Sequence, residues 1–334
     1  MLIQYAEHGS AERVTELVNP ANDGTTTAAT ASGHSLVVGG RACVLPVPGE
    51  ATSRFVLDSA FPLSKIFRGA VRPALQIALL EADAVAIHAA CVEMDGVAIA
   101  VAGWSESGKT ETALALMEVG ARFVSDKWTV VGADTSAGTF PITVGVRRWV
   151  LDSLPQLRAA LPRGARVQLG CAGVAATVTR PVRGSGGGRV GRRVTETIDR
   201  GIALADRAAL TPTQIAAAYR HELNPVESPP LGTVALLSTV PGDGVTVDEV
   251  DARWAARRLA RSAAYERRDY FELFERARFA TADGQPTPFR LSVEQREEAF
   301  LADVLAGVTL LRVRAPFPAD PRLIATAIME QAGR

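Results

Sequence analysis

The sequence has few cysteines, no excess charge of either sign and no long apolar run. Only Cys43, Cys91 and Cys171 are present, and their odd number and wide spacing argue against a disulfide framework or a CxxC-type metal site. The 36 Lys and Arg balance 36 Asp and Glu, which argues against attachment to nucleic acid or anionic lipid through overall charge. The apolar stretch Gly96–Gly103 is far too short to span a bilayer.

Apolar residues are plentiful, in contrast. They make up 47% of the 334 residues, enough for a sizeable core. At roughly 150 residues per domain, this length predicts two domains or one large one. The N-terminus has no basic segment followed by an apolar core, so we expect no signal peptide. We therefore expect a cytoplasmic protein that binds neither nucleic acid nor membrane.

The chain divides into a β-rich beginning and a longer second part. Short apolar runs between glycines predict an N-terminal β-rich region over residues 1–84, packed on a core domain over residues 85–334. Residues 157–207 are rich in Arg and Gly and predict a mobile loop, with a flexible insert near 180–195. Further elements are expected at Pro73–Ala82 (helix), Gly232–Ser238 (strand), Asp251–Phe279 (one or two helices), Val293–Leu305 (helix), Val308–Val313 (strand) and Asp320–Gln331 (helix).

The most strongly patterned part lies near residue 100. The apolar runs Ala84–Glu93 and Val97–Ala102 flank an Asp-Gly pair, which indicates a β-hairpin. The second run leads into a glycine-bounded loop, then a predicted helix over Lys109–Val119 and a strand over Arg122–Ser125. This order of strand, loop, helix and strand is typical of a βαβ-like unit.

The loop Gly103–Thr110 fits the phosphate-loop pattern G-x-x-x-x-G-K-[ST] at every fixed position. Its glycines let successive backbone N–H groups turn toward phosphate oxygens, and the following helix adds the positive end of its dipole. Lys109 is expected to reach the β- and γ-phosphates and Thr110 to bind Mg²⁺. The predicted nucleotide-binding residues are Gly103, Ser105, Glu106, Ser107, Gly108, Lys109, Thr110 and Glu111.

Three side chains near this loop have two interpretations each. Asp126 ends the predicted strand, where it either holds Mg²⁺ or caps a turn. Glu111 follows Thr110, as a member of the site or simply as a favourable acid in the first turn of a helix. His88 lies in the hairpin that leads to the loop, as a catalytic group or as a histidine satisfied within the strand.

The segment from His88 to Asp126 resembles the catalytic core of the HPr kinase/phosphorylase family, whose fold is related to that of phosphoenolpyruvate carboxykinase. The matching pieces are His88, the phosphate loop followed directly by Glu111, and Gly-Ala-x-x-Val-Ser-Asp at residues 120–126. The resemblance covers residues 85–131. It implies an α/β (α+β) fold, with a mixed, largely antiparallel sheet around the phosphate loop, flanked by helices, and a small N-terminal β-rich region.

The resemblance also implies a catalytic set. Lys109 and Thr110 would bind the phosphates of ATP and Mg²⁺, with Asp126 as a second metal ligand. Asp126 would accept the proton of the attacking hydroxyl or steer that hydroxyl. His88 would lie close to the phosphates as a polar or proton-handling group.

Two departures from the family separate the chain from authentic HPr kinases. Family members usually have two consecutive aspartates where this chain has Asp126-Lys127. The downstream Glu-x-x-Gly-Leu-Gly element is absent, and the Arg/Gly stretch around Gly184–Gly188 stands in a comparable place. Both differences argue against HPr as the acceptor and favour another hydroxyl, in a peptide serine or a small metabolite.

The sequence therefore supports one main hypothesis and one alternative. The first is an ATP- and Mg²⁺-dependent kinase acting on a hydroxyl of a peptide or protein serine, or of a small metabolite. The alternative is a nucleotide-binding regulatory protein that uses the fold without phosphoryl transfer, which Lys127 favours. A GTPase is disfavoured because no guanine-specifying Asn-Lys-x-Asp is present. The segment Arg253–Arg278 is either a homo-oligomer surface or an ordinary core helix.

Overall fold

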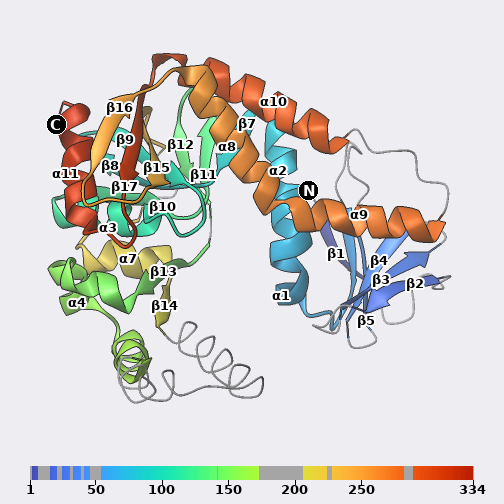
Figure 1. Cartoon of the computed structure of the whole chain (residues 1–334). Helices are drawn as coiled ribbons and strands as arrows, with labels where there is room; N and C mark the ends of the chain where they lie inside the picture. Colours follow the sequence, from blue (N-terminus) through green and yellow to red (C-terminus); the bar gives the residue numbers. More distant parts are fainter. Residues whose placement is uncertain are drawn as a thin grey trace, which may run out of the picture. The chain divides into compact units, whose positions relative to one another are not determined.

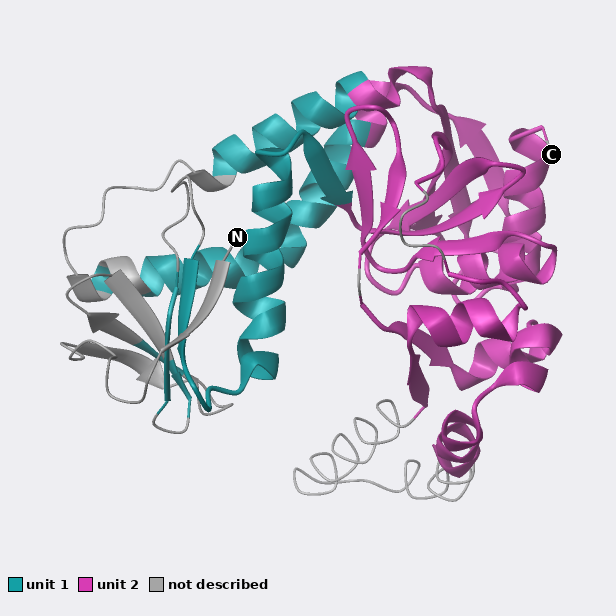
Figure 2. Ribbon diagram, turned by 180° about the vertical axis from the view of Figure 1, so that it is seen from behind, with its two compact units in different colours: residues 1–86, 256–303 teal, residues 87–255, 304–334 magenta. Residues whose placement is uncertain are grey.

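The computed structural model describes most of the chain and shows two compact units (Figures 1 and 2). The described residues are 2–6, 16–20, 25–30, 33–38, 41–45, 54–140, 142–172, 206–223, 228–281 and 289–333. Unit 1 comprises residues 1–86 and 256–303, and unit 2 comprises residues 87–255 and 304–334. The expected mixed α/β fold with a small N-terminal β region is confirmed. The insert expected near 180–195 lies outside the described residues.

Unit 1 contains a six-stranded sheet in the order β1-β6-β5-β4-β3-β2. β1 and β6 are parallel, and the other neighbours are antiparallel. The strands are β1 (Leu2–Ala6), β2 (Glu16–Pro20), β3 (Thr25–Thr30), β4 (Gly33–Val38), β5 (Arg41–Val44) and β6 (Arg54–Asp58).

Residues 256–303 belong to unit 1, and their described part is largely helical. The predicted domain division, which placed them with the nucleotide-binding domain, is therefore wrong at this point. In α9 the rings of Tyr270 and Phe274 are buried in one apolar cluster with Phe55 of β6, so these two rings belong to the core of unit 1. At the α8–α9 junction the buried Arg267 donates to Glu297 Oε1 of α10 at 2.7 Å. The helices are α1 (Leu63–Ile66), η1 (Phe67–Val71), α2 (Arg72–Leu80), most of α8 (Ala252–Glu266), α9 (Arg268–Thr281) and α10 (Phe289–Val304).

Unit 2 is built on a six-stranded sheet in the order β10-β8-β9-β15-β17-β16. β9, β15 and β17 run parallel, and the remaining neighbours are antiparallel, so the sheet is mixed as expected. Asp95 and Gly96 form the predicted two-residue turn, with φ of 53° and 78°. The strands are β8 (Ala89–Met94), β9 (Val97–Gly103), β10 (Arg122–Ser125), β15 (Leu231–Thr239), β16 (Thr246–Glu249) and β17 (Thr309–Ala315).

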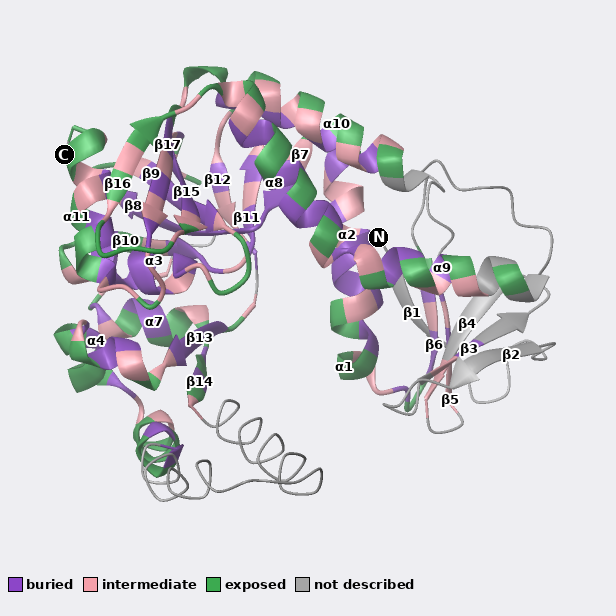
Figure 3. Cartoon of the chain, in the orientation of Figure 1, coloured by how far each residue is buried: buried purple, intermediate pink, exposed green. Residues whose placement is uncertain are grey.

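The core of unit 2 lies between one face of this sheet and its helices. Alternate residues of β9 and β15 (Ile99 and Val101, Ala235 and Leu237) belong to one buried cluster, as expected from the two-residue period of a strand. The same cluster includes apolar side chains of α3 (Lys109–Glu118) and α11 (Pro321–Gln331). Figure 3 shows the buried strands at the centre of the unit and the exposed outer faces of these helices.

A smaller layer completes the unit and differs from the prediction in two places. Residues 157–207 were expected to form a loop, yet α4 (Pro155–Ala160) and the helical residues 163–172 lie there, because Leu157, Leu161 and Leu169 are buried. The expected strand Ala84–Glu93 is interrupted at His88, which separates β7 (Ala84–Ile87) from β8. The layer also contains the pairs β11–β12 (Thr129–Gly132, Ala137–Thr139) and β13–β14 (Val144–Arg147, Arg207–Leu210), with η2 (Arg148–Asp152) and α7 (Pro212–Ala218).

No helix in the described part of the chain is both long and apolar enough to cross a membrane.

Candidate nucleotide-binding site

The predicted phosphate loop connects the end of β9 to the start of α3. Gly108 is the N-cap of α3 and has a φ of 92°, in the left-handed region that glycine tolerates. Lys109 and Thr110 are the first two helical residues. The strand, loop and helix that the pattern requires are therefore present. The first-turn N–H groups and the dipole of α3 are directed at the loop, which makes its mouth favourable for an anion.

Gly103 is required by a close approach between two strands. Its φ is 154°, and a β-carbon added there would lie 2.9 Å from the backbone oxygen of Leu237 in β15 and 2.6 Å from Ser107 Oγ. The backbone oxygen belongs to a central strand and cannot move far. The first glycine of the loop therefore fixes how closely the loop passes β15.

Replacing Gly103 with alanine is expected to destabilise the fold by about 1–3 kcal/mol, the usual range for overpacking. Gly307→Ala is the matched control, since nothing lies within 4 Å of a β-carbon there. Denaturant unfolding of both variants measures the difference. Equal stability of the two variants would contradict the role given to Gly103.

Lys109 is buried within the loop, and its amine faces the loop's own backbone. Nζ donates to the carbonyl oxygen of Trp104 at 2.6 Å, and the Ser107 N–H donates to the same oxygen at 3.3 Å. The Ser107 hydroxyl is buried and has no hydrogen-bond partner among the described residues, while Ser105 is exposed. A positive charge, the unpartnered Ser107 hydroxyl and backbone donors thus surround the place where phosphates are expected.

Asp126 lies beside Thr110, as the sequence predicts. It follows the last residue of β10, is only 2% exposed, and accepts a hydrogen bond on Oδ1 from the Thr110 hydroxyl at 2.7 Å. Its Oδ2 is buried and has no hydrogen-bond partner among the described residues. Burial raises the pKa of Asp126 above its ordinary value, against the lowering effect of the Thr110 hydrogen bond.

The turn that holds Asp126 is fixed by its neighbours. Lys127 has a φ of 63°, and the Trp128 N–H donates to the Asp126 carbonyl oxygen at 2.8 Å. The buried Trp128 ring stacks on His88, with ring centroids 5.0 Å apart and an interplanar angle of 26°. The register Ala89↔Ala102 sets His88 level with Gly103 at the same end of the sheet. His88 thus supports the Asp126 turn through Trp128, and its catalytic role stays a prediction.

The two glutamates of the loop region differ in environment. Glu111 is buried in the first turn of α3, and this burial raises its pKa, with Arg147 among the charges that oppose the rise. Glu106 has a φ of 62° and is exposed, and its carboxylate forms an ion pair with Arg147 of β13 at 2.7 Å. The Glu106 side chain is therefore directed at an arginine, which leaves only its backbone to face phosphates.

Two arginines that were not predicted from the sequence border the phosphate loop. Arg147 and Arg207 lie directly opposite each other in the antiparallel pair β13–β14. Arg147 and Arg207 are 60 residues apart in the sequence, and neither arginine lies in a recognisable motif. A strand is indicated by the alternating pattern Thr143-Val144-Gly145-Val146-Arg147. Nothing in this pattern indicates that the strand lies beside the phosphate loop.

The site fits a magnesium ion by its donor chemistry. The unpartnered Asp126 Oδ2 and the Thr110 hydroxyl are hard oxygen donors, and Mg²⁺ at nucleotide sites usually takes one or two protein oxygens with water and phosphate. Within the described ranges, no group of three or more His, Cys, Asp or Glu could hold a metal by itself. The residues therefore suit a metal that also takes phosphate and water oxygens as ligands.

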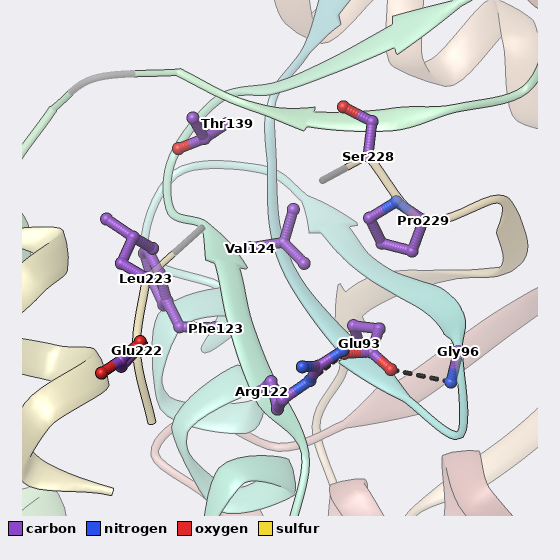
Figure 4. Close-up of a pocket in the computed structure, with 10 residues that line it drawn as sticks. All are labelled: Glu93, Gly96, Arg122, Phe123, Val124, Thr139, Glu222, Leu223, Ser228 and Pro229. Carbon is purple, nitrogen blue, oxygen red and sulfur yellow. Dashed lines mark hydrogen bonds and ion pairs between the residues drawn. The ribbon is translucent and has the colours of Figure 1, made fainter. Parts of the chain in front are cut away.

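A separate cavity lies at the end of the six-stranded sheet of unit 2 that is opposite to the phosphate loop (Figure 4). Its volume is about 250 Å³, and its lining includes Glu93, Gly96 and Arg122. Glu93 accepts a hydrogen bond from the Gly96 N–H at 2.7 Å and pairs with Arg122. Gly96 lies just before β9 and Gly103 at its end, roughly 23 Å apart at about 3.3 Å per residue. This cavity is therefore a structural feature of the hairpin end, away from the phosphate loop.

No protein-family model matches the chain, and no curated protein matches it in sequence. The resemblance to the HPr kinase/phosphorylase family accordingly rests on the residues His88–Asp126 alone, and the function is argued from the geometry of the site.

Proposed function

We propose that the protein is an ATP- and Mg²⁺-dependent kinase that transfers the γ-phosphoryl group to a hydroxyl of a peptide or protein serine, or of a small metabolite. The observation that carries the proposal is the hydrogen bond between Thr110 of the phosphate loop and the buried Asp126, whose second oxygen has no partner. A carboxylate beside the phosphate-loop threonine can hold the Mg²⁺ of a bound nucleotide, and in a phosphoryl transferase it can also accept the proton of the acceptor hydroxyl.

Each residue has a distinct task in this proposal. The loop backbone and Lys109 bind the phosphates, and Thr110 and Asp126 hold the metal. Bound Mg²⁺ would neutralise charge on the β- and γ-phosphates. Asp126 orients the acceptor hydroxyl and accepts its proton as the acceptor oxygen bonds to the γ-phosphorus. The bond from the γ-phosphorus to the β–γ bridging oxygen breaks, and ADP leaves. Without metal, burial raises the pKa of Asp126, and bound Mg²⁺ would favour its ionised form, which is the form that accepts a proton.

The direct test is incubation with ATP labelled in the γ-phosphate, together with serine peptides and small alcohols as separate acceptor pools. We expect Mg²⁺-dependent label in one pool from the wild type. Nucleotide binding with no label in any pool would favour the second function, a nucleotide-responsive regulatory protein. Lys127 is the observation that favours it, because a cation follows Asp126 where the resembling family usually has a second carboxylate.

Thr110→Val is expected to raise the Mg²⁺ concentration needed for nucleotide binding by roughly 10- to 100-fold, the range for loss of a metal-site partner. The substitution keeps the shape of the side chain and removes the hydroxyl that donates to Asp126. Thr110→Ser is the matched control, since it keeps the hydroxyl. Magnesium titrations of nucleotide binding measure both. The same midpoint for valine and serine would contradict the metal role of Thr110.

A further inference from the structure

Arg147 and Arg207 place two positive charges side by side at the edge of the phosphate loop. They are directly opposite in the β13–β14 pair, and directly opposite residues of an antiparallel pair project from the same face. Like charges in this arrangement destabilise a sheet. The chain therefore carries a local cost here, which an anion bound between the two guanidinium groups would reverse.

The direction of this pair is set by two contacts. Arg147 reaches Glu106 of the phosphate loop at 2.7 Å, so the shared face of β13–β14 is turned toward the loop. The guanidinium of Arg207 lies over Gly145, two residues before Arg147, in the space that a β-carbon at position 145 would occupy. Gly145 thus provides the room in which Arg207 lies.

The pair lies on the Asp126 side of the site. The positive charge of Arg207 is near enough to Asp126 to favour its ionised form, and that of Arg147 does the same for Glu111. An exposed ion pair such as Arg147–Glu106 contributes little to stability, so a phosphoryl group with two or more charges competes easily for the same guanidinium. Arginine suits this task because its planar fork matches the oxygens of a phosphate.

We propose that Arg147 and Arg207 bind the oxygens of the γ-phosphoryl group, with Arg147 exchanging Glu106 for phosphate when a triphosphate enters. This inference rests on the proposed nucleotide site, but not on the acceptor or on catalysis. It assigns a chemical function to β13–β14 and a steric function to Gly145. The proposal also predicts that the site discriminates a triphosphate from a diphosphate, because a diphosphate lacks the γ-phosphoryl group that the two arginines bind.

The test compares the affinities for a non-hydrolysable ATP analogue and for ADP, both with Mg²⁺. Arg147→Ala and Arg207→Ala are each expected to weaken analogue binding roughly tenfold or more, as for loss of a charged hydrogen-bond partner, while ADP binding changes less than about threefold. Gly145→Ala keeps both arginines but displaces the Arg207 guanidinium, so it should reproduce the Arg207→Ala result. Arg148→Ala is the control, since Arg148 pairs with Asp206 at 3.1 Å.

The outcomes separate the two proposals. Wild-type binding of the analogue with unchanged affinity in both arginine variants would overturn this inference and leave the nucleotide site standing. An equal loss of ADP binding would also overturn it, because the arginines would then hold the other phosphates. Failure of the wild type to bind either nucleotide would overturn the proposed function itself. Folding of each variant is checked by its thermal unfolding midpoint.

Discussion

Asp126→Asn is expected to lower Mg²⁺-dependent phosphoryl transfer by roughly 10²- to 10⁴-fold, the range for removal of a general base. Asparagine keeps the size of the side chain and an oxygen that accepts from Thr110, so the hydrogen bond of 2.7 Å can persist. It removes the negative charge that the metal and the acceptor proton require. Initial rates with labelled ATP measure the effect, and a variant with wild-type rates would refute the role of Asp126.

The same substitution is expected to change the pH dependence of stability. Burial raises the pKa of Asp126, so the folded protein holds this proton more tightly than the unfolded chain does. In the wild type without nucleotide, the contribution of protonated Asp126 to the free energy of unfolding is fully present below the ordinary pKa of an aspartate. It is lost as pH rises through the raised pKa. Asparagine does not titrate, so the variant does not lose stability in this way. Glu111 has a raised pKa as well, but it is present in both proteins and cancels in the comparison.

Denaturant unfolding at a series of pH values measures this difference. The free energy of unfolding of the wild type should fall relative to that of Asp126→Asn as pH rises from acid to neutral. A constant difference across the series would show that Asp126 titrates as an exposed aspartate does, and would contradict the buried position described above.

Lys109→Ala is expected to lower the rate of phosphoryl transfer by roughly 10²- to 10³-fold, as found when one preorganised electrostatic donor is removed. Its amine lies inside the loop, held by the Trp104 carbonyl oxygen at 2.6 Å, where the β- and γ-phosphates are expected. The sequence contains only two other lysines, Lys65 and Lys127. Lys65→Ala is a suitable control because Lys65 is exposed in α1 of unit 1.

The scarcity of lysine gives a second measurement of the same prediction. Amine-directed labelling followed by mass spectrometry can resolve all three lysines individually. Mg·ATP should protect Lys109 and leave Lys65 unchanged. Labelling of Lys109 that is indifferent to ATP would contradict its placement at the phosphates.

The local part of the site could be predicted from the sequence because its signals are short-range. Gly103–Thr110 follows a fixed spacing, the Asp-Gly turn determines the β8–β9 hairpin, and Asp126 ends a strand only 16 residues after Thr110. Each of these depends on backbone conformation or on neighbours in sequence. The structure confirms the strand, the loop and the helix, and it places Thr110 in hydrogen-bond contact with Asp126.

The remaining parts depend on contacts between distant residues. Arg147 reaches Glu106 across 41 positions, and its partner strand lies beyond the segment that was expected to be a loop. Tyr270 and Phe274 pack with Phe55, which no periodicity within 251–279 specifies, so residues 256–303 were assigned to the wrong unit. A helical pattern predicts which face of a helix is apolar, but not which surface it covers.

The measurement that tests the central claim most directly is calorimetric binding of a non-hydrolysable ATP analogue to the wild type, Lys109→Ala and Asp126→Asn, with and without Mg²⁺. A nucleotide site at Gly103–Thr110 predicts saturable one-to-one binding to the wild type that strengthens with Mg²⁺. It also predicts weaker binding by Lys109→Ala, and a Mg²⁺ effect that is lost in Asp126→Asn. Absence of binding to the wild type at millimolar analogue, or binding that both variants retain unchanged with its Mg²⁺ dependence, would contradict the account.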